Sequence, residues 1–251
     1  MSHWASILRG GPVPPWLLAR PIAHRGLHDA VHPENSVAAF EAAAEAGLPI
    51  ELDVQRTHDG GAVVFHDEAL SRLTGQPGQV TETSQAELEQ LPLLGTSQTI
   101  PSLDRVLAVV DDRVPIVVEI KASGPRGALE RVVRDALRRR PGRYVVQSFD
   151  PWSLVWMRRH APEIPRGMLS TDFRDDAGLP RYQEVVLEHL MMTPWVRPHY
   201  VGYDLRALPH PAPSQLRAAG VPLLAWTVRD AAQLARARSL ADNVIFEGVE
   251  P

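Results

Sequence analysis

Short apolar runs rich in β-branched residues alternate with longer segments of helical periodicity from Pro21 to the end of the chain. Several runs, such as 116–118 and 223–226, are apolar without a break, which is typical of parallel strands buried on both faces. This alternation predicts parallel βαβ units. The predicted strands are 22–26, 50–55, 62–66, 116–121, 144–149, 167–170, 200–204, 223–228 and 244–247. The predicted helices are 36–46, 129–140, 151–160, 181–190, 214–219 and 231–238.

One pair of predicted strands, 50–55 and 62–66, is separated by too few residues for a crossover helix. Asp59-Gly60 between alternating apolar residues is a strong hairpin signal, so the second strand is expected to run antiparallel to the first. A two-residue turn would pair Asp53 with His66, and a slip of one residue would remove that pairing. The eight other strands match a TIM (β/α)₈ barrel, with an open doubly wound sheet as the alternative.

Two segments differ in pattern from the predicted barrel. Residues 67–101 are punctuated by glycine and proline and contain one short predicted helix near 84–91, which indicates a small insertion after the second strand and the hairpin. Residues 1–20 form a predicted N-terminal arm with Trp4, Trp16 and several prolines and glycines. The expected organisation is therefore an arm, 1–20, and a single catalytic domain, 21–251.

The amino-acid composition excludes several kinds of site and partner. The chain of 251 residues has no cysteine, which excludes disulfides, thiolate nucleophiles and zinc-thiolate sites. With 26 Lys plus Arg and 30 Asp plus Glu, the net charge is −4, so no global attraction for nucleic acid is expected. No stretch approaches the roughly 20 apolar residues of a transmembrane segment, and the start of the chain makes a poor secretory signal. We expect a cytoplasmic protein.

Carboxylates lie where buried strands are predicted. Glu51 and Asp53 are two residues apart, so both side chains point to one face, and Glu119 with Lys121 repeats the arrangement on the next barrel strand. Unpaired buried carboxylates are costly, so these residues form either an ion-pair network that serves packing or a site. Three convergent carboxylates suit a hard cation such as Mg²⁺ or Ca²⁺, and Lys121 can neutralise a carboxylate or hold a substrate oxyanion.

Two histidines lie at the ends of strands near these carboxylates. His24 is followed by Arg25, which can bind phosphate, and by Gly26, which permits a tight turn. His66 ends the hairpin strand. Imidazoles carry protons near neutral pH, although a single histidine in a strand is more often structural. Asn35 or Ser36 is expected to cap the following helix, whose N-terminus could also face an anion.

The chain resembles the glycerophosphodiester phosphodiesterase family in an ordered series of motifs. Each motif is weak alone, and the order and spacing together are specific. The series comprises His24-Arg25-Gly26, Glu34-Asn35-Ser36, Glu51-Leu52-Asp53-Val54, Thr57-His58-Asp59-Gly60, Val64-Phe65-His66-Asp67, Leu70, Arg72-Leu73-Thr74-Gly75, Ile100-Pro101-Ser102-Leu103, Glu119-Ile120-Lys121, Gln147-Ser148-Phe149 and Trp226-Thr227-Val228.

The resemblance implies a TIM barrel that hydrolyses glycerophosphodiesters, which are small-molecule substrates, to glycerol 3-phosphate and an alcohol with one divalent cation, Mg²⁺ or Ca²⁺. It implies metal ligands at Glu51, Asp53 and Glu119, catalytic histidines at His24 and His66, and phosphate contacts at Arg25 and Lys121. We interpret His24 as the base and His66 as the acid, with the reverse left open. The nucleophile is water or the adjacent glycerol hydroxyl.

Three alternatives stay open at this point. Trp226 is either a wall for glycerol in the substrate site or a core aromatic residue. A lysophospholipase D-like activity would fit the same barrel, with the Trp- and Pro-rich arm as an apolar mouth. A non-catalytic phosphate-binding barrel is disfavoured because a pure binder has no need of paired proton carriers such as His24 and His66.

Overall fold

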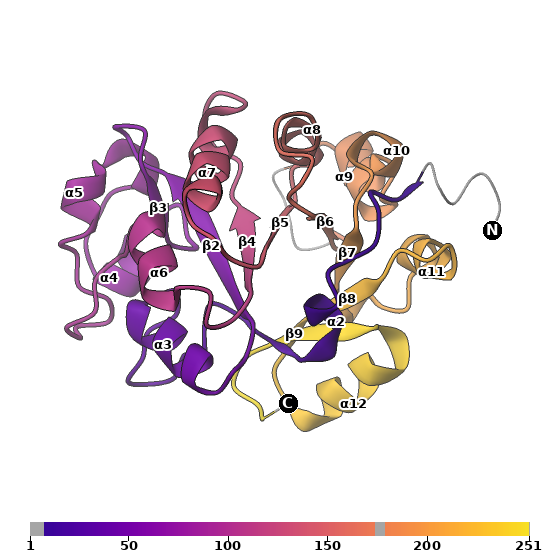
Figure 1. Ribbon diagram of the computed structural model, residues 1–251, viewed down its shortest axis with the longest axis horizontal. Coiled ribbons are helices and arrows are strands. Elements are labelled where there is room, and N and C mark those ends of the chain that lie inside the picture. The colour runs from indigo at the N-terminus through magenta and orange to yellow at the C-terminus, as the bar shows by residue number, and fades with distance from the viewer. Residues whose placement is uncertain (1–7, 174–178, 251) are drawn as a thin grey trace. The chain divides into compact units, whose positions relative to one another are not determined.

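The computed structural model describes residues 8–173 and 179–250. They belong to two compact units, one formed by Ile22–Val145 and the other by Met1–Pro21 together with Val146–Pro251. Strands and helices alternate along both units in the order typical of a (β/α)₈ barrel (Figure 1). Each predicted strand corresponds to an observed strand, with ends that differ by a few residues. Within the described ranges, every helix is too short or too polar to cross a membrane.

The sheet of the unit Ile22–Val145 is organised around β2 (Ile50–Arg56). Strands β1 (Ile22–Ala23) and β4 (Ile116–Ile120) pair with it in parallel. Nearly all residues of β2 and β4 are buried, as continuous apolar strands of a parallel sheet require. The register places Asp53 beside Glu119, so the polar residues of the two strands share one face.

Three helices follow the parallel strands of this unit: α3 (Val37–Glu45), α6 (Leu103–Val110) and α7 (Ala128–Arg139). Ser36 is the N-cap of α3, and its hydroxyl accepts a hydrogen bond from the Ala39 N–H. The helix α6 is absent from the predicted set. Its buried residues, Leu103, Val106, Leu107 and Val110, nevertheless have the i, i+3, i+4, i+7 spacing of an amphipathic helix.

The hairpin is antiparallel as predicted, but the predicted register is wrong by one residue. In β3 (Ala62–Val64), Val64 lies opposite Val54, and the Phe65 N–H donates to the Asp53 carbonyl. Asp53 therefore faces Phe65 and not His66. The cause is a turn of three residues instead of two, because Thr57 N–H bonds to the Gly61 carbonyl around a loop in which Gly60 has φ 88°.

The predicted insertion contains the short elements α4 (Ser71–Thr74), η1 (Val80–Glu82) and α5 (Gln85–Leu88). Ser84 and Glu87 form a capping box at the start of α5. A cluster of buried apolar side chains joins this segment to the hairpin strand. Its members are Val63, Phe65, Leu70, Leu73, Val80, Leu88, Leu93 and Ile100.

The remaining parallel strands belong to the other unit, except that Tyr144 and Val145, the first two residues of β5 (Tyr144–Ser148), belong to the unit Ile22–Val145. The strands that follow β5 are β6 (Arg166–Ser170), β7 (Tyr200–Asp204), β8 (Leu223–Val228) and β9 (Asn243–Phe246). The helices are α8 (Pro151–His160), α9 (Arg181–Glu188), α10 (Thr193–Val196), α11 (Pro211–Ala218) and α12 (Ala231–Leu240), with the 3₁₀ helix η2 (Leu205–Ala207) after β7. Neighbouring strands pair in chain order from β5 to β9.

Part of the predicted N-terminal arm packs on this unit. The short helix α2 (Trp16–Ala19) contacts β9. The Asn243 side-chain amide donates to the carbonyls of Leu17 and Arg20, at 2.7 and 2.8 Å. Residues 1–7 lie outside the described ranges, and the assignment of 21–251 to one domain stays a prediction.

A buried histidine lies between β6 and β7. His199 is 8% exposed, and its Nδ1 accepts a hydrogen bond of 3.2 Å from the Arg166 backbone N–H. The Arg166 side chain is also buried and donates to the Val196 carbonyl. Burial and the neighbouring Arg166 charge lower the pKa of His199 to about 4.

This lowered pKa predicts a pH-dependent stability. Between about pH 6.5 and 4 the unfolded chain protonates His199 while the folded chain does not, so stability is complete above this interval and is lost as the pH falls through it. One such group changes the free energy of unfolding by at most about 1.4 kcal/mol per pH unit. Urea unfolding of His199→Asn should show a weaker acid dependence than the wild type. The control is His58→Asn, at an exposed position. If the free energy of unfolding depended on pH equally in all three proteins, the prediction would be contradicted.

Candidate active site

Three buried carboxylates converge on one face of β2 and β4. Glu51 and Asp53 are each 1% exposed and Glu119 is 7% exposed. One carboxylate oxygen from each lies within 4.8 Å of the others. The parallel register explains this convergence, because it aligns Asp53 with Glu119 and residues two apart share a face.

Two cations neutralise part of this charge. The Lys121 Nζ lies 3.1 Å from Asp53 Oδ1 and 2.7 Å from Glu119 Oε1. The Arg25 Nε lies 3.2 Å from Asp53 Oδ2, and the Arg25 backbone N–H donates to Glu51 Oε2 at 3.1 Å. Asp53 is thus held by both cations, one at each of its oxygens.

The carboxylates differ in pKa because they differ in partners. Burial opposes ionisation of Asp53, but Lys121 and Arg25 outweigh it and lower the pKa of this carboxyl. Burial, together with repulsion from Asp53 and Glu119, raises the pKa of Glu51 well above its usual value. Burial also raises the pKa of Glu119, although Lys121 acts against it. Two cations therefore do not fully compensate three carboxylates.

This donor set fits a hard divalent cation. All its ligand atoms are carboxylate oxygens, which Mg²⁺ and Ca²⁺ prefer. The raised pKa values of Glu51 and Glu119 indicate a site that a further positive charge would stabilise.

A tight turn after β1 places the backbone of Arg25 beside Glu51. Arg25 and Gly26 both have left-handed backbone angles, with φ 56° and 81°. A Cβ at Gly26 would lie 2.8 Å from the Ala39 carbonyl carbon, so only glycine fits against α3. His24, which begins this turn, is close enough to Asp53 to lower the pKa of that carboxyl, as is His66.

Asn35 is a site residue that our sequence reasoning treated only as a possible helix cap. It is fully buried, and its amide Nδ2 donates to Asp53 Oδ2 at 2.9 Å. Its Oδ1 accepts the Asp53 backbone N–H at 3.3 Å. Asn35 has φ 57°, a left-handed angle that asparagine tolerates better than most residues. The sequence signal that could have identified Asn35 is its place directly before Ser36, the N-cap of α3.

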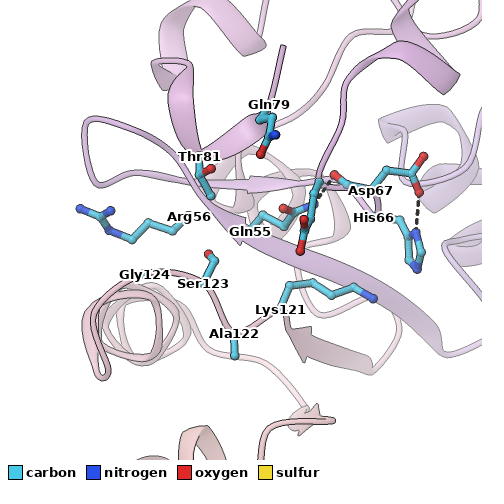
Figure 2. Close-up of a pocket in the computed structure, with 11 residues that line it drawn as sticks. Gln55, Arg56, His66, Asp67, Gln79, Thr81, Lys121, Ala122, Ser123 and Gly124 are labelled. Carbon is cyan, nitrogen blue, oxygen red and sulfur yellow. Dashed lines mark hydrogen bonds and ion pairs between the residues drawn. The ribbon is translucent and has the colours of Figure 1, made fainter. Parts of the chain in front are cut away.

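His66 belongs to a chain of charged side chains that the sequence did not reveal. Its Nδ1 lies 2.7 Å from Asp67 Oδ1, as Figure 2 shows. Arg72 binds Asp67 and also Glu34, at 2.8 Å for the latter, and Glu34 in turn binds Arg25 at 2.6 Å. Burial lowers the pKa of His66 in spite of attraction to Asp53 and the bond to Asp67. This series of ion pairs connects His66 to the turn after β1.

A pocket of about 830 Å³ opens beside these groups. His66, Asp67 and Lys121 line one part of it (Figure 2). Polar residues of β2, of the segment around η1 and of the loop after β4 line the rest. The cluster thus has adjacent space for a ligand of substantial size.

Trp226 lies on β8 in the other unit and is half-buried. Its ring packs edge-on against Phe149, with the ring centroids 5.4 Å apart. Its Nε1 is buried without a hydrogen-bond partner among the described residues. Its role in the substrate site stays a prediction.

A second group of metal-ligating residue types occurs in the same unit as Trp226. Glu188, His189 and His210 bring ligand atoms within 4.8 Å of one another. His210, however, caps α11, because its Nδ1 accepts the Ala212 N–H. A neutral ring then carries its proton on Nε2, which lies 3.3 Å from a Glu188 oxygen. This geometry describes a hydrogen-bonded helix cap and leaves no lone pair on His210 for a metal.

Comparison with known proteins identifies the class to which this site belongs. The model of the glycerophosphoryl diester phosphodiesterase family matches residues 24–246, so the chain belongs to that family. A solved Oleispira antarctica phosphodiesterase in complex with the product sn-glycerol-3-phosphate superposes with a TM-score of 0.77 at 27% identity, covering 92% of this chain and 93% of that one. The chain has the TIM (β/α)₈ barrel fold of these structures, as predicted.

Curated relatives match the chain over a shorter segment. An uncharacterised Bacillus subtilis protein is 38% identical over 161 residues, which span 60% of this chain and 66% of that protein. A glycerophosphodiester phosphodiesterase from Caldanaerobacter subterraneus is 35% identical over 161 residues, spanning 59% of this chain and 65% of that enzyme. The chain matches just under two thirds of the length of these relatives.

The contacts of Asn35 predict a large effect of its removal. Asn35→Ala should lower the free energy of unfolding by about 1–3 kcal/mol for the unpaired groups left on Asp53, and by roughly 1 kcal/mol more because alanine resists the left-handed angle. Asn35→Gly removes the same hydrogen bonds without that strain and should be intermediate. Urea denaturation measures both variants, and a fully stable Asn35→Gly would show that the amide contributes nothing.

Proposed function

We propose that this chain hydrolyses glycerophosphodiesters to glycerol 3-phosphate and an alcohol, with one divalent cation, Mg²⁺ or Ca²⁺. The observation that carries the proposal is the buried group of Glu51, Asp53 and Glu119 beside the cations Arg25 and Lys121. Membership of the phosphodiesterase family supports the reaction. The sn-glycerol-3-phosphate in the Oleispira antarctica structure supports the product.

We assign Glu51, Asp53 and Glu119 as the metal ligands. A bound divalent cation would supply charge neutralisation at the oxygens of the phosphodiester. The protein itself provides fixed positive charge at the same place. Lys121 has three N–H donors, of which Asp53 and Glu119 engage two, and the third is available to a phosphate oxygen. Arg25, held by Asp53 and Glu34, is the second phosphate-binding group.

The two histidines are proposed to move protons. His24 removes a proton from the nucleophile, which is water or the adjacent glycerol hydroxyl, and His66 protonates the departing alkoxide. A new P–O bond forms at the nucleophile while the P–O bond to the alcohol breaks. With the glycerol hydroxyl as nucleophile, this step gives a cyclic phosphate, which water then opens to glycerol 3-phosphate. Asp67 fixes Nδ1 of His66, so Nε2 is the nitrogen left for the substrate. The negative charge of a bound phosphodiester would favour the protonated His66 that an acid requires.

The first test is release of glycerol 3-phosphate from glycerophosphocholine with Mg²⁺, with Ca²⁺ and with EDTA. We expect turnover with at least one metal, loss in EDTA and recovery on adding metal back. Glu119→Gln should raise the metal concentration for half-maximal activity about tenfold or more, at least the effect of an outer-sphere partner. The exposed Glu45→Gln on α3 is the matched control. Absence of turnover with either metal would contradict the proposal.

The acid role of His66 has its own test. His66→Ala should reduce kcat on glycerophosphocholine by about 10²-fold or more, the scale of general acid catalysis. The loss should be smaller on a glycerophosphodiester of nitrophenol, because a good leaving group departs without a proton. His58→Ala, at an exposed position of the hairpin turn, serves as the control. Full activity of His66→Ala on the choline substrate would rule out the acid role.

A further inference from the structure

The pocket beside the carboxylates is larger than phosphate recognition requires. Its volume of about 830 Å³ lies in the range of roughly 300–1,000 Å³ found for sites of drug-sized ligands. Figure 2 shows His66 at one end of the lining side chains and Arg56 at the other, with Lys121 and Ser123 between them. If phosphate is bound near Lys121 and His66, most of the pocket is left for the alcohol part of the substrate.

The charges along this pocket are unevenly compensated. Lys121 is paired with Asp53 and Glu119, and Asp67 is paired with Arg72 and His66. Arg56, in contrast, makes no side-chain hydrogen bond or ion pair with the residues that the structure describes. Its guanidinium lies beside the hairpin turn and the loop after β4. A Cβ added at Gly60 or at Gly124 would be 3.6 Å from Nη2 or 3.9 Å from Nη1, respectively.

A hydroxyl in the same part of the pocket also lacks a partner. The Ser123 Oγ is buried and has no hydrogen bond among the described residues. Buried polar groups in folded proteins are satisfied as a rule, so an orphaned one in a pocket lining indicates a group that a ligand completes. The side chains of Gln79 and Thr81 line the pocket as well. Together with Arg56 these are donors that suit an anionic group.

The position of Arg56 bears on the length of the alcohol. Arg56 lies three residues beyond Asp53 on β2, which corresponds to about 10 Å along a strand. Along the strand the two residues are thus separated by more than the length of a short alcohol such as choline or ethanolamine. An alcohol that itself carries a phosphate is long enough to span this separation.

We propose that this pocket binds the leaving alcohol and that Arg56 and Ser123 recognise a second phosphate group on it. Arginine is the side chain best suited to such a group, because its planar donors match phosphate oxygens in pairs. The preferred substrates are then glycerophosphodiesters whose alcohol bears a phosphate, either as a terminal monoester or within a second diester. This inference rests on the proposed phosphodiesterase function and adds the substrate class.

One other unpaired charge lines the pocket, and it supports the competing hypothesis that the pocket binds a cationic alcohol. Glu68 makes no side-chain contact of this kind with the described residues, and it is exposed to solvent. Water therefore satisfies its carboxylate, whereas the Ser123 hydroxyl is shielded. A pocket built around Glu68 would instead select cationic alcohols such as choline.

The test compares kcat/KM for four substrates with the metal-loaded full chain, following loss of the phosphodiester by phosphorus NMR. They are glycerophosphoglycerophosphate, bis(glycerophospho)glycerol, neutral glycerophosphoglycerol and cationic glycerophosphocholine. We expect at least one of the first two to exceed both of the others about tenfold or more, the effect of one charge-assisted hydrogen bond. The first two substrates distinguish a terminal phosphate from an internal one.

Variants then test the residues. Arg56→Gln should lower the ratio of kcat/KM for the phosphate-bearing over the neutral substrate about tenfold, mainly through KM, and Arg56→Lys should retain part of it. Ser123→Ala should lower the ratio less. Arg105→Gln, at an exposed arginine on α6, is the control that leaves it unchanged.

Several results would overturn the inference. A wild-type preference for glycerophosphocholine that Glu68→Gln removes would assign the pocket to cations. Equal kcat/KM for all four substrates, or a ratio that Arg56→Gln does not change, would exclude phosphate recognition and leave the proposed function intact. Absence of turnover of every substrate with both metals would overturn the proposed function and this inference together.

Discussion

The organisation of the site depends on the buried carboxylate of Asp53. A charge in this position is unfavourable unless ion pairs and hydrogen bonds compensate it. Lys121 binds one oxygen, and Arg25 and Asn35 bind the other. These partners are the residue directly after β4, a residue of the turn after β1 and the residue before the N-cap of α3. Compensation of one charge therefore fixes the positions of three segments that are distant in sequence.

A second set of ion pairs extends this order to the insertion. Glu34 binds both Arg25 and Arg72, and Arg72 binds Asp67, which holds His66. The apolar cluster that includes Phe65 also packs this segment against the hairpin strand. The insertion thus does more than cover part of the fold, because it orients a proposed catalytic histidine through Arg72. Surface ion pairs contribute little alone, and here several share partners in a network.

The strands and the same-face carboxylates were predictable because both follow from short-range periodicity. Alternation over two residues is enough to bring Glu51 and Asp53 together, and parallel pairing adds Glu119. The hairpin register was not predictable, because Gly60 allows a three-residue loop as readily as a two-residue turn. His66 is nevertheless close enough to Asp53 to lower the pKa of that carboxyl, and Asp67, itself paired with Arg72, holds the His66 ring.

Asn35 and Arg72 were missed as site residues for a related reason. Each acts through contacts between residues far apart in the chain, 18 positions for Asn35 with Asp53 and 38 for Arg72 with Glu34. A local pattern can single out a position, as the asparagine before an N-cap serine does, but it does not identify the distant partner. The family motifs contain both residues, so the resemblance carried information that periodicity did not.

The charge balance of the site separates reaction chemistry from specificity. Near Asp53 nearly every charge has a partner, and a change to one member leaves another charge buried and unpaired. Along the pocket, Arg56 and Ser123 are uncommitted and lie at the end of β2 and in the loop after β4. Loops tolerate substitution far better than buried networks do. The proposed reaction and the proposed selectivity for the alcohol therefore depend on different residues, the buried network around Asp53 for the first and Arg56 with Ser123 for the second.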